Sequence, residues 1–391
     1  MNKDFFERGI EEIIVQSSFE EKLKSKKPLR IKMGFDPTRP DIHLGHAVGL
    51  WKLKELQDAG HKIIFLVGDY TTKIGDPSGR NSTRPVLTDA EIEQNARTYF
   101  DQVGKILNVK KAEIRANSEW FAKMSFGDIL QLVGKFTAAQ ILERDDFAKR
   151  LDMGNDISLH ELLYPVMQAY DSVMLRADVE FGGTDQKFNL LAGRDLQKKM
   201  GQAPQNVVMV KLLVGLDGKE KMSKSADNYI SITEESDQMF GKIMSIPDGL
   251  IIDYFSLCTL LSDKEIEKVG NNLRNGANPR DIKLLLAEEI VTLYHTKKES
   301  LGAKKEFLNR FSKKELPTDI PEISIPEKNI DILTFVTLAD ESLSKSDARR
   351  VIEQGGVKID GTKITDPLVE IGIKKGLVIQ IGKLKVYKVK K

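Results

Sequence analysis

Cysteine is almost absent from this sequence, with Cys258 the single example among 391 residues. One cysteine excludes an internal disulfide and favours a reducing compartment. Because its neighbours are mostly apolar, we expect a buried core thiol and not a nucleophile. The sequence also has no run of about 18 apolar residues, and residues 1–12 have no apolar core flanked by basic residues. We therefore expect no membrane span, no signal peptide and a cytoplasmic location.

Several common catalytic motifs are missing as well. There is no G-x-x-x-x-G-K-[ST] loop, which excludes a P-loop enzyme, and no G-x-G-x-x-G follows the first apolar strand, which disfavours a dinucleotide oxidoreductase. The five histidines and the lone cysteine show no metal-ligand spacing. No G-x-S-x-G nucleophile elbow is present. A dedicated metal site in the protein is therefore not expected.

Length and charge predict more than one domain. A chain of 391 residues is too long for one ordinary domain. The formal net charge is only +2, yet residues 330–391 carry 12 Lys and Arg against 8 Asp and Glu. The basic excess therefore lies in the C-terminal tail. Pro317, Pro321 and Pro326 precede this tail, so we assign residues 317–329 to a stiff linker.

The centre of the predicted fold is one βαβ unit. Residues 29–33 predict a buried strand, residues 43–59 an amphipathic helix, and residues 63–67 the next buried strand. His43 and His46 lie on one side of the first turn of this helix, with Gly45 between them. Free N–H groups and the helix dipole favour anions at such a helix start. Alone, this pair would be read as two structural histidines.

The remaining segments extend this unit into an α/β protein. Residues 1–27 look helical, and Thr88 with Glu91 predicts a capping box at the start of a helix to residue 107. Strands are expected at residues 112–117, 178–181 and 206–214. The expected organisation is a Rossmann-like parallel-sheet catalytic domain (1–220) with a helical insertion at about 118–176, an α-helical domain (221–316), the linker, and a small α+β module (330–391).

A second basic cluster lies far downstream of the histidines. Lys221 and Lys224 are three residues apart in K-E-K-M-S-K-S (219–225), after a Gly-containing loop. Alone, they would be read as solvated surface charge. Together with the histidines and Thr38, they suit in-line attack on an α-phosphate, because preorganised donors stabilise the charge that develops on the phosphate oxygens and the departing pyrophosphate.

The histidine and lysine segments, in this order, resemble the two signatures of class I aminoacyl-tRNA synthetases. Three further segments resemble the bacterial tyrosyl-tRNA synthetases whose second signature reads K-M-S-K-S: I-G-D-P-S-G (74–79), Y-P-V-M-Q-A-Y-D (164–171) and G-G-T-D-Q-K-F-N (182–189). The resemblance runs from Leu29 to the C-terminus. It implies that a homodimer forms tyrosyl-adenylate from L-tyrosine and ATP, which carries Mg²⁺, and passes the tyrosyl group to tRNA(Tyr).

The resemblance also implies roles for individual residues. Asp76, Tyr164 and Gln168 would bind the α-ammonium of tyrosine, and Asp171 would accept the phenol hydroxyl. Tyr164, Gln168 and Asp171 fall on one helix face, which agrees with a shared pocket. The other implied sites are catalytic contacts from His43, His46, Thr38, Lys221, Lys224 and Ser225, ATP or adenylate contacts from Gly34, Asp36, Gly45, Gly183, Asp185 and Lys224, and Gln186 beside the tyrosine. Arg80 and Arg84 would contact phosphate or the tRNA acceptor end, or be solvated surface charges.

One position departs from the family pattern. Many members have Tyr-Cys before the G-F-D-P-T segment, and that tyrosine also contacts the phenol hydroxyl. Here the pair is Lys32-Met33. The second phenol contact is therefore missing or comes from elsewhere, with Tyr70 and Thr71 as candidates.

The tail resembles an RNA-binding module first seen in a small-subunit ribosomal protein, through S-K-S-D-A-R-R (344–350) and G-G-V-K-I-D-G (355–361). The resemblance implies RNA contacts from Lys345, Arg349 and Arg350, made by charge and shape. Locally, residues 346–347 predict a helix cap, and Asp360-Gly361 predicts a hairpin turn. Two other functions stay open: a tryptophanyl-tRNA synthetase, which shares both signatures, and a non-catalytic RNA-binding protein derived from a synthetase.

Overall fold

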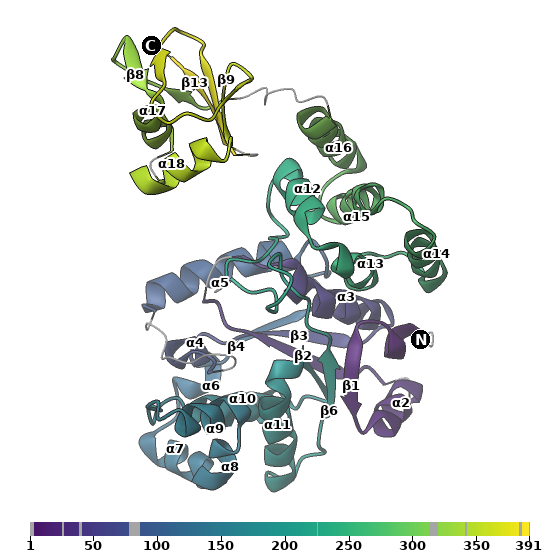
Figure 1. The fold of residues 1–391 in the computed structure, drawn as a ribbon. Coiled ribbons are helices and arrows are strands. Elements are labelled where there is room, and N and C mark those ends of the chain that lie inside the picture. The colour runs from purple at the N-terminus through teal and green to yellow at the C-terminus, as the bar shows by residue number, and fades with distance from the viewer. Residues whose placement is uncertain are drawn as a thin grey trace. The chain divides into compact units, whose positions relative to one another are not determined.

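The chain folds into two compact units, Met1–Lys304 and Lys305–Lys391. The computed structural model describes residues 4–25, 27–38, 41–77, 87–224, 226–312, 320–340, 342–382 and 385–390. Within these ranges, no helix has both the length and the apolar character needed to cross a membrane. Figure 1 shows the sheet of the first unit with helices on both of its faces.

A six-stranded sheet forms the centre of the first unit, in the order β1-β6-β5-β2-β3-β4. Its strands are β1 (Ile10–Ile14), β2 (Arg30–Phe35), β3 (Lys62–Val67), β4 (Glu113–Ala116), β5 (Val179–Gly183) and β6 (Asn206–Val210). All neighbours are parallel except β1, which runs antiparallel to β6. From β2 the chain extends the sheet through β3 and β4 on one side, then through β5 and β6 on the other. The strand order therefore reverses between β2 and β5, which is where sheets of this type bind ligands.

Helices cover both faces of this sheet. Helix α3 contacts β3 and β5, and α11 contacts β5 and β6; in Figure 1 they lie on opposite sides of the sheet. The inner strands are apolar throughout, with Ile31, Phe65 and Phe181 all buried, as expected for parallel strands covered on both faces. Outside the helical insertion and the later helical region, the helices of this unit are α1 (Asp4–Glu7), α2 (Gln16–Lys24), α3 (Leu44–Asp58), α4 (Thr71–Ile74), α5 (Asp89–Val103) and α11 (Lys187–Lys199).

The expected helical insertion and second helical region are both present. The insertion consists of α6 (Ser118–Phe121), α7 (Phe126–Val133), α8 (Ala138–Leu142), α9 (Asp145–Asp152) and α10 (Leu163–Leu175). The later region consists of α12 (Ser236–Ser245), α13 (Ile251–Cys258), α14 (Asp263–Arg274), α15 (Pro279–Tyr294) and α16 (Lys297–Ser312). Cys258 is buried, as expected. The region of α12–α15 belongs to the same compact unit as the sheet, whereas the sequence placed a domain boundary at residue 220.

Of two local predictions for the N-terminal part of the chain, one is confirmed and the other is wrong in part. The capping box at Thr88 is confirmed, because Thr88 Oγ1 accepts from the Glu91 N–H and the Glu91 carboxylate accepts from the Thr88 N–H. The expectation that residues 1–27 are helical is wrong in its middle, where β1 pairs with β6. Ile10, Ile13 and Ile14 have the spacing of a helix face, but the edge of the sheet supplies backbone partners that an isolated helix would not have.

The second unit is a small α+β module. A five-stranded sheet has the order β10-β9-β12-β13-β7, and β8 pairs with β11 in a separate ribbon. The elements are β7 (Glu322–Ile323), β8 (Asn329–Asp331), α17 (Ile332–Ala339), α18 (Lys345–Glu353), β9 (Val357–Ile359), β10 (Thr362–Ile364), β11 (Glu370–Gly372), β12 (Val378–Ile381) and β13 (Lys385–Val389). Positive φ angles at Asp360 (45°) and Gly361 (82°) fit the expected two-residue hairpin turn. Helix α18 is capped by Ser344, two residues before the expected position.

Part of the expected linker belongs to this module. Strand β7 pairs with β13, and Ile325 is buried in the module's core with Ile332 and Phe335. Residues 317–319 lie outside the described part of the chain. Proline residues at 321 and 326 thus flank a short edge strand, which is a position in a sheet that tolerates proline.

Candidate active site

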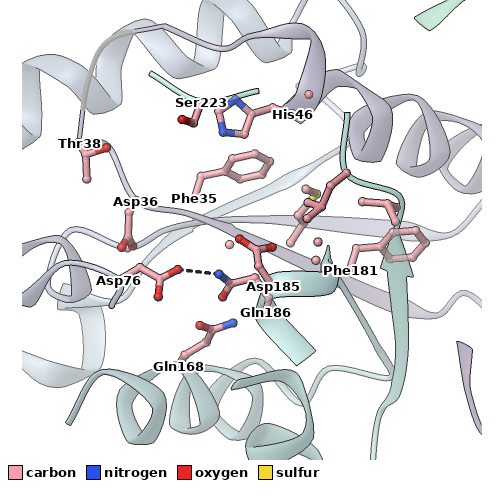
Figure 2. A pocket seen from close by; sticks show the side chains of 18 of the residues that line it. Phe35, Asp36, Thr38, His46, Asp76, Gln168, Phe181, Asp185, Gln186 and Ser223 are labelled. Carbon is pink, nitrogen blue, oxygen red and sulfur yellow. Dashed lines mark hydrogen bonds between the residues drawn. The ribbon is translucent and has the colours of Figure 1, made fainter. Parts of the chain in front are cut away.

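A cavity of about 560 Å³ opens at the carboxyl ends of β2 and β5, where the strand order reverses. Residues from the histidine segment, the lysine loop and the middle of the chain line it together, as Figure 2 shows for ten of the lining residues. The predicted site residues that line it are Gly34, Asp36, Thr38, His43, Gly45, His46, Asp76, Tyr164, Gln168, Asp171, Gly183, Asp185, Gln186, Lys221 and Lys224. Ser225, Arg80 and Arg84 lie outside the described residues. Lys345, Arg349 and Arg350 are exposed on α18 of the second unit.

The two histidines form a stacked pair at the start of α3. His43 is the residue before the helix, and its ring centroid lies 3.8 Å from that of His46. Burial, reinforced by Lys224, lowers the pKa of His43 to about 3, and burial with His43 and the lysines lowers the pKa of His46 well below its ordinary value. Both imidazoles are therefore neutral near pH 7, and each has one N–H to donate. A Cβ at Gly45 would lie 3.1 Å from the His43 ring, so any residue larger than glycine would crowd this ring.

The loop after β6 brings both predicted lysines to the cavity. Lys221 Nζ lies 2.6 Å from a carboxylate oxygen of Asp185. Lys224 Nζ lies 2.8 Å from the hydroxyl of Tyr99 and 5.0 Å from the centre of that ring. Asn228 shapes the loop, because its side chain accepts from the Ser223 N–H and donates to the Lys221 carbonyl. Two cations and two neutral imidazoles thus face one cavity, an arrangement suited to a polyphosphate.

One side of the cavity is acidic. The Tyr164 hydroxyl donates to Asp36 over 2.9 Å, and burial beside Asp36 and Asp76 raises the pKa of Tyr164 well above its ordinary value. Asp76 accepts from Gln186 Nε2 at 2.6 Å, the contact drawn in Figure 2. Gln168 projects from α10 toward this pair. Carboxylate, hydroxyl and amide oxygens here suit a small cation such as an α-ammonium group. Asp36, which the resemblance assigned to the adenylate, is thus hydrogen-bonded to Tyr164, which it assigned to the ammonium.

The carboxylate of Asp171 also lines the pocket. Asp171 is only 2% exposed, and it accepts from Trp120 Nε1 at 3.0 Å and from Asn117 Nδ2 at 3.3 Å. Burial raises its pKa to about 7. Thr71, one of the two candidates for a second phenol contact, lines the cavity and also accepts from Asn117. The other candidate, Tyr70, stacks on Phe121.

Sequence reasoning missed four residues that hold the predicted ones in place. Asn117 and Trp120 bind Asp171, Tyr99 binds Lys224, and Arg144 forms an ion pair with Asp76 at 3.0 Å. Asn117 had a usable signal, because it follows β4 at the edge of the sheet where the other site residues lie. Tyr99 and Trp120 come from helices and Arg144 from the bend before α9, and none of these segments shows a local sign of the site.

Comparison with known proteins identifies the family. The sequence profile described as tRNA synthetases class I (W and Y) matches residues 24–312, and that of the S4 domain matches residues 341–371. The tyrosine–tRNA ligase of Moorella thermoacetica is 47% identical over 383 residues, covering 97% of this chain and 93% of the relative. That of Bordetella avium is 50% identical over 382 residues, with the same two coverages. The chain belongs to the tyrosine–tRNA ligase family.

Solved structures of tyrosyl- and tryptophanyl-tRNA synthetases share the fold. The mitochondrial tyrosyl-tRNA synthetase of Aspergillus nidulans aligns with a TM-score of 0.67 at 23% identity, covering 79% of this chain and 95% of that one. The tyrosyl-tRNA synthetase of Archaeoglobus fulgidus, complexed with L-tyrosine, gives 0.62 at 23% identity, covering 77% and 98%. A tryptophanyl-tRNA synthetase from Plasmodium falciparum gives 0.59 at 17%, covering 75% and 81%. The expected α/β fold class is confirmed, but fold likeness alone does not separate the two amino acids.

Proposed function

We propose that this chain attaches L-tyrosine to tRNA(Tyr) in two steps, through tyrosyl-adenylate. The observation that carries the proposal is a single cavity in which the histidine pair, both loop lysines and a buried carboxylate meet. The full-length similarity to curated tyrosine–tRNA ligases supports tyrosine over tryptophan. It equally disfavours a role limited to RNA binding.

In the first step, the tyrosine carboxylate attacks the α-phosphorus of ATP. A bond forms between the carboxylate oxygen and phosphorus, and the bond from phosphorus to the pyrophosphate oxygen breaks. We assign His43, His46, Thr38, Lys221 and Lys224 to the negative charge that develops on the phosphate oxygens and the leaving pyrophosphate. The substrate supplies the nucleophile, so the protein needs none. Mg²⁺ enters as part of the ATP substrate.

The tyrosine is held at both of its polar ends. Asp76, Tyr164 and Gln168, with Gln186, bind the α-ammonium, and Asp171 accepts the phenol hydroxyl. Phenylalanine would leave the buried Asp171 carboxylate without that partner, which is costly. The rejection of phenylalanine by tyrosyl-tRNA synthetase is itself a well-known example of this effect. Gly34, Gly45, Gly183 and Asp185 line the space for the adenylate.

In the second step, a hydroxyl of the terminal adenosine of the tRNA attacks the tyrosyl carbonyl, and AMP leaves. The functional division that we propose is activation in residues 1–220, tRNA support from the helical region, and RNA backbone contacts from the C-terminal module. Exposed Lys345, Arg349 and Arg350 on α18 support that last role. A tRNA substrate and a single cysteine favour work in the cytoplasm.

We further propose that two copies of the chain associate through the helical insertion. Large apolar side chains are exposed there, including Phe126 (76%), Leu130 (56%) and Leu159 (83%). Phe126 and Leu130 are four residues apart on α7 and so share a helix face. A second copy of the same surface would cover this apolar area. Sedimentation velocity should give a dimer for the native chain and a monomer for Phe126→Ser with Leu159→Ser; a monomeric native chain would contradict this interface.

The activity is tested by amino-acid-dependent exchange of pyrophosphate into ATP. Tyrosine should support exchange, and phenylalanine and tryptophan should not. Asp171→Ala should lose most of the preference for tyrosine over phenylalanine. Exchange with tryptophan instead would establish the sister activity. RNA binding without exchange with any amino acid would establish the non-catalytic alternative.

A further inference from the structure

A fully buried ion pair lies next to the cavity, on two central strands of the sheet. Lys32 on β2 and Glu180 on β5 are neighbours in the parallel sheet, and Lys32 Nζ lies 2.7 Å from Glu180 Oε1. The side chains are 0% and 1% exposed. Lys32 also lines the cavity, as do Gln168 and Asp171. Burying two charges carries a large desolvation cost, so a buried pair at this position points to a specific role.

The donors of Lys32 are all used within the protein. Its ammonium donates to Glu180, to the Ser172 hydroxyl at 3.0 Å and to the Gln168 carbonyl at 3.3 Å. An ammonium group has three N–H donors, so none is left over for a phenol hydroxyl. Lys32 therefore does not simply substitute for the tyrosine that occupies this position in many relatives.

The pair acts instead on one face of α10. Gln168, Asp171 and Ser172 lie three and four residues apart, so their side chains share a helix face. Lys32 donates to the main-chain carbonyl of Gln168 and to the Ser172 hydroxyl, and Glu180 Oε2 accepts from that hydroxyl at 2.7 Å. Asp171 lies between these two anchors. Gln205 holds Glu180 from the other side, through a hydrogen bond of 2.5 Å.

The charges of the pair also reach Asp171. Lys32 favours the ionised form of this carboxyl group, and Glu180 opposes it more weakly. The other groups acting on it, Asn117 and Trp120, are neutral donors. An ionised carboxylate is a stronger acceptor for a phenol O–H than a neutral carboxyl group, and burial works against ionisation.

We propose that Lys32 is a specificity-positioning residue: with Glu180 it fixes the face of α10 that carries Gln168 and Asp171, and its charge favours the Asp171 carboxylate, the stronger acceptor for the tyrosine hydroxyl. This inference rests on the proposed function. It explains how the site can do without the usual second phenol contact.

A merely structural ion pair is the competing account, and a double substitution separates the two. Lys32→Met with Glu180→Gln removes both charges at similar volume, so no buried charge is left unpaired and folding should be retained. Lys32→Met alone leaves Glu180 unpaired and should lower the unfolding midpoint. Lys32→Arg keeps the charge. Asp171→Asn identifies which limb of the pH profile belongs to Asp171.

The measurements are kcat/KM for tyrosine and for phenylalanine in pyrophosphate exchange, from pH 6 to 9, with the KM for ATP as a control. In Lys32→Met, we expect the acidic limb for tyrosine to move up by about one pH unit, which lowers kcat/KM at pH 7 about fivefold. In the double variant the limb should move up by less, because the opposing charge of Glu180 is removed as well. The preference over phenylalanine should fall with it, while the KM for ATP stays unchanged. Lys32→Arg should keep the limb near its original position.

The proposal would be wrong if the double variant had the native acidic limb and the native preference for tyrosine over phenylalanine. Restoring stability would then have been enough to restore specificity. An acidic limb at the native pH in Lys32→Met would contradict the proposal as well. This single variant therefore still tests the proposal if the double variant does not fold. Failure of the proposed function looks different, since the native chain would then show no tyrosine-dependent exchange at all.

Discussion

At the scale of single residues, Tyr99 belongs to the site together with the predicted lysines. Its hydroxyl lies 2.8 Å from Lys224 Nζ, and both side chains are largely buried, at 2% and 8% exposure. Tyr99 belongs to α5, whereas Lys224 lies on the loop after β6, so this contact joins two segments 125 residues apart in the chain. A buried ammonium with a fixed acceptor is held in one position, which electrostatic catalysis requires.

Replacing Tyr99 by phenylalanine should therefore slow tyrosine activation. The variant keeps the ring beneath the ammonium but removes the hydroxyl. A hydrogen bond to a charged group contributes roughly 1.5 kcal/mol, so we expect kcat for pyrophosphate exchange to fall about tenfold. The KM for tyrosine should not change. Tyr294→Phe is the matched control, because its hydroxyl accepts from Trp51 away from the cavity; equal losses in both variants would argue against a specific role for Tyr99.

At the scale of elements, Glu113 ties three strands together at one edge of the sheet. This residue of β4 binds Arg30 of β2 through two hydrogen bonds of 3.0 and 3.1 Å, and Lys62 of β3 at 3.0 Å. Its side chain is 18% exposed. Hydrogen bonding from Arg30, with help from Lys62 and Arg115, lowers the pKa of Glu113 to about 2.

The lowered pKa predicts a pH-dependent contribution to stability. Because the folded-state pKa lies below the ordinary value of 4.5, the contribution is complete above that value and is lost as the pH falls toward 2. Glu113→Gln should lower the free energy of unfolding by about 2 kcal/mol at pH 7, and by less at about pH 3.5. Urea titrations at both pH values measure the difference. Glu119→Gln, a more exposed partner of Arg115, should have a smaller effect; a difference for Glu113 that does not change with pH would refute the linkage.

The elements also show how far the sequence could be interpreted. Parallel strands and capped helices were predictable because their signals are local, as at Thr88 and in the apolar run of β3. Strand β1 was not, because its partner β6 lies almost 200 residues away and its isoleucines have helical spacing. The site followed the same rule. The described residues of the recognisable segments were predicted to share a cavity and line it together, whereas Arg144 and Trp120 bind Asp76 and Asp171 only through tertiary packing.

At the scale of the whole molecule, catalysis and RNA contact are expected to be separable. The cavity lies entirely within Met1–Lys304, and Lys345, Arg349 and Arg350 lie in the other compact unit. Replacing these three residues by glutamine should raise the KM for tRNA(Tyr) and leave tyrosine-dependent pyrophosphate exchange unchanged. If they contact phosphates, the slope of log binding constant against log salt should become shallower by about 0.7 per lost contact.

A matched neutralisation in the first unit shows whether total charge or position matters. Lys110, Lys111 and Lys123 are exposed and line no part of the cavity, so their replacement by glutamine removes the same charge. We expect the α18 variant to lose more tRNA affinity and more salt dependence than this control. Equal losses would mean that tRNA responds to overall charge alone, because long-range attraction does not depend on which side chains touch the phosphates. A loss confined to α18 would instead require direct contact between that helix and the RNA backbone.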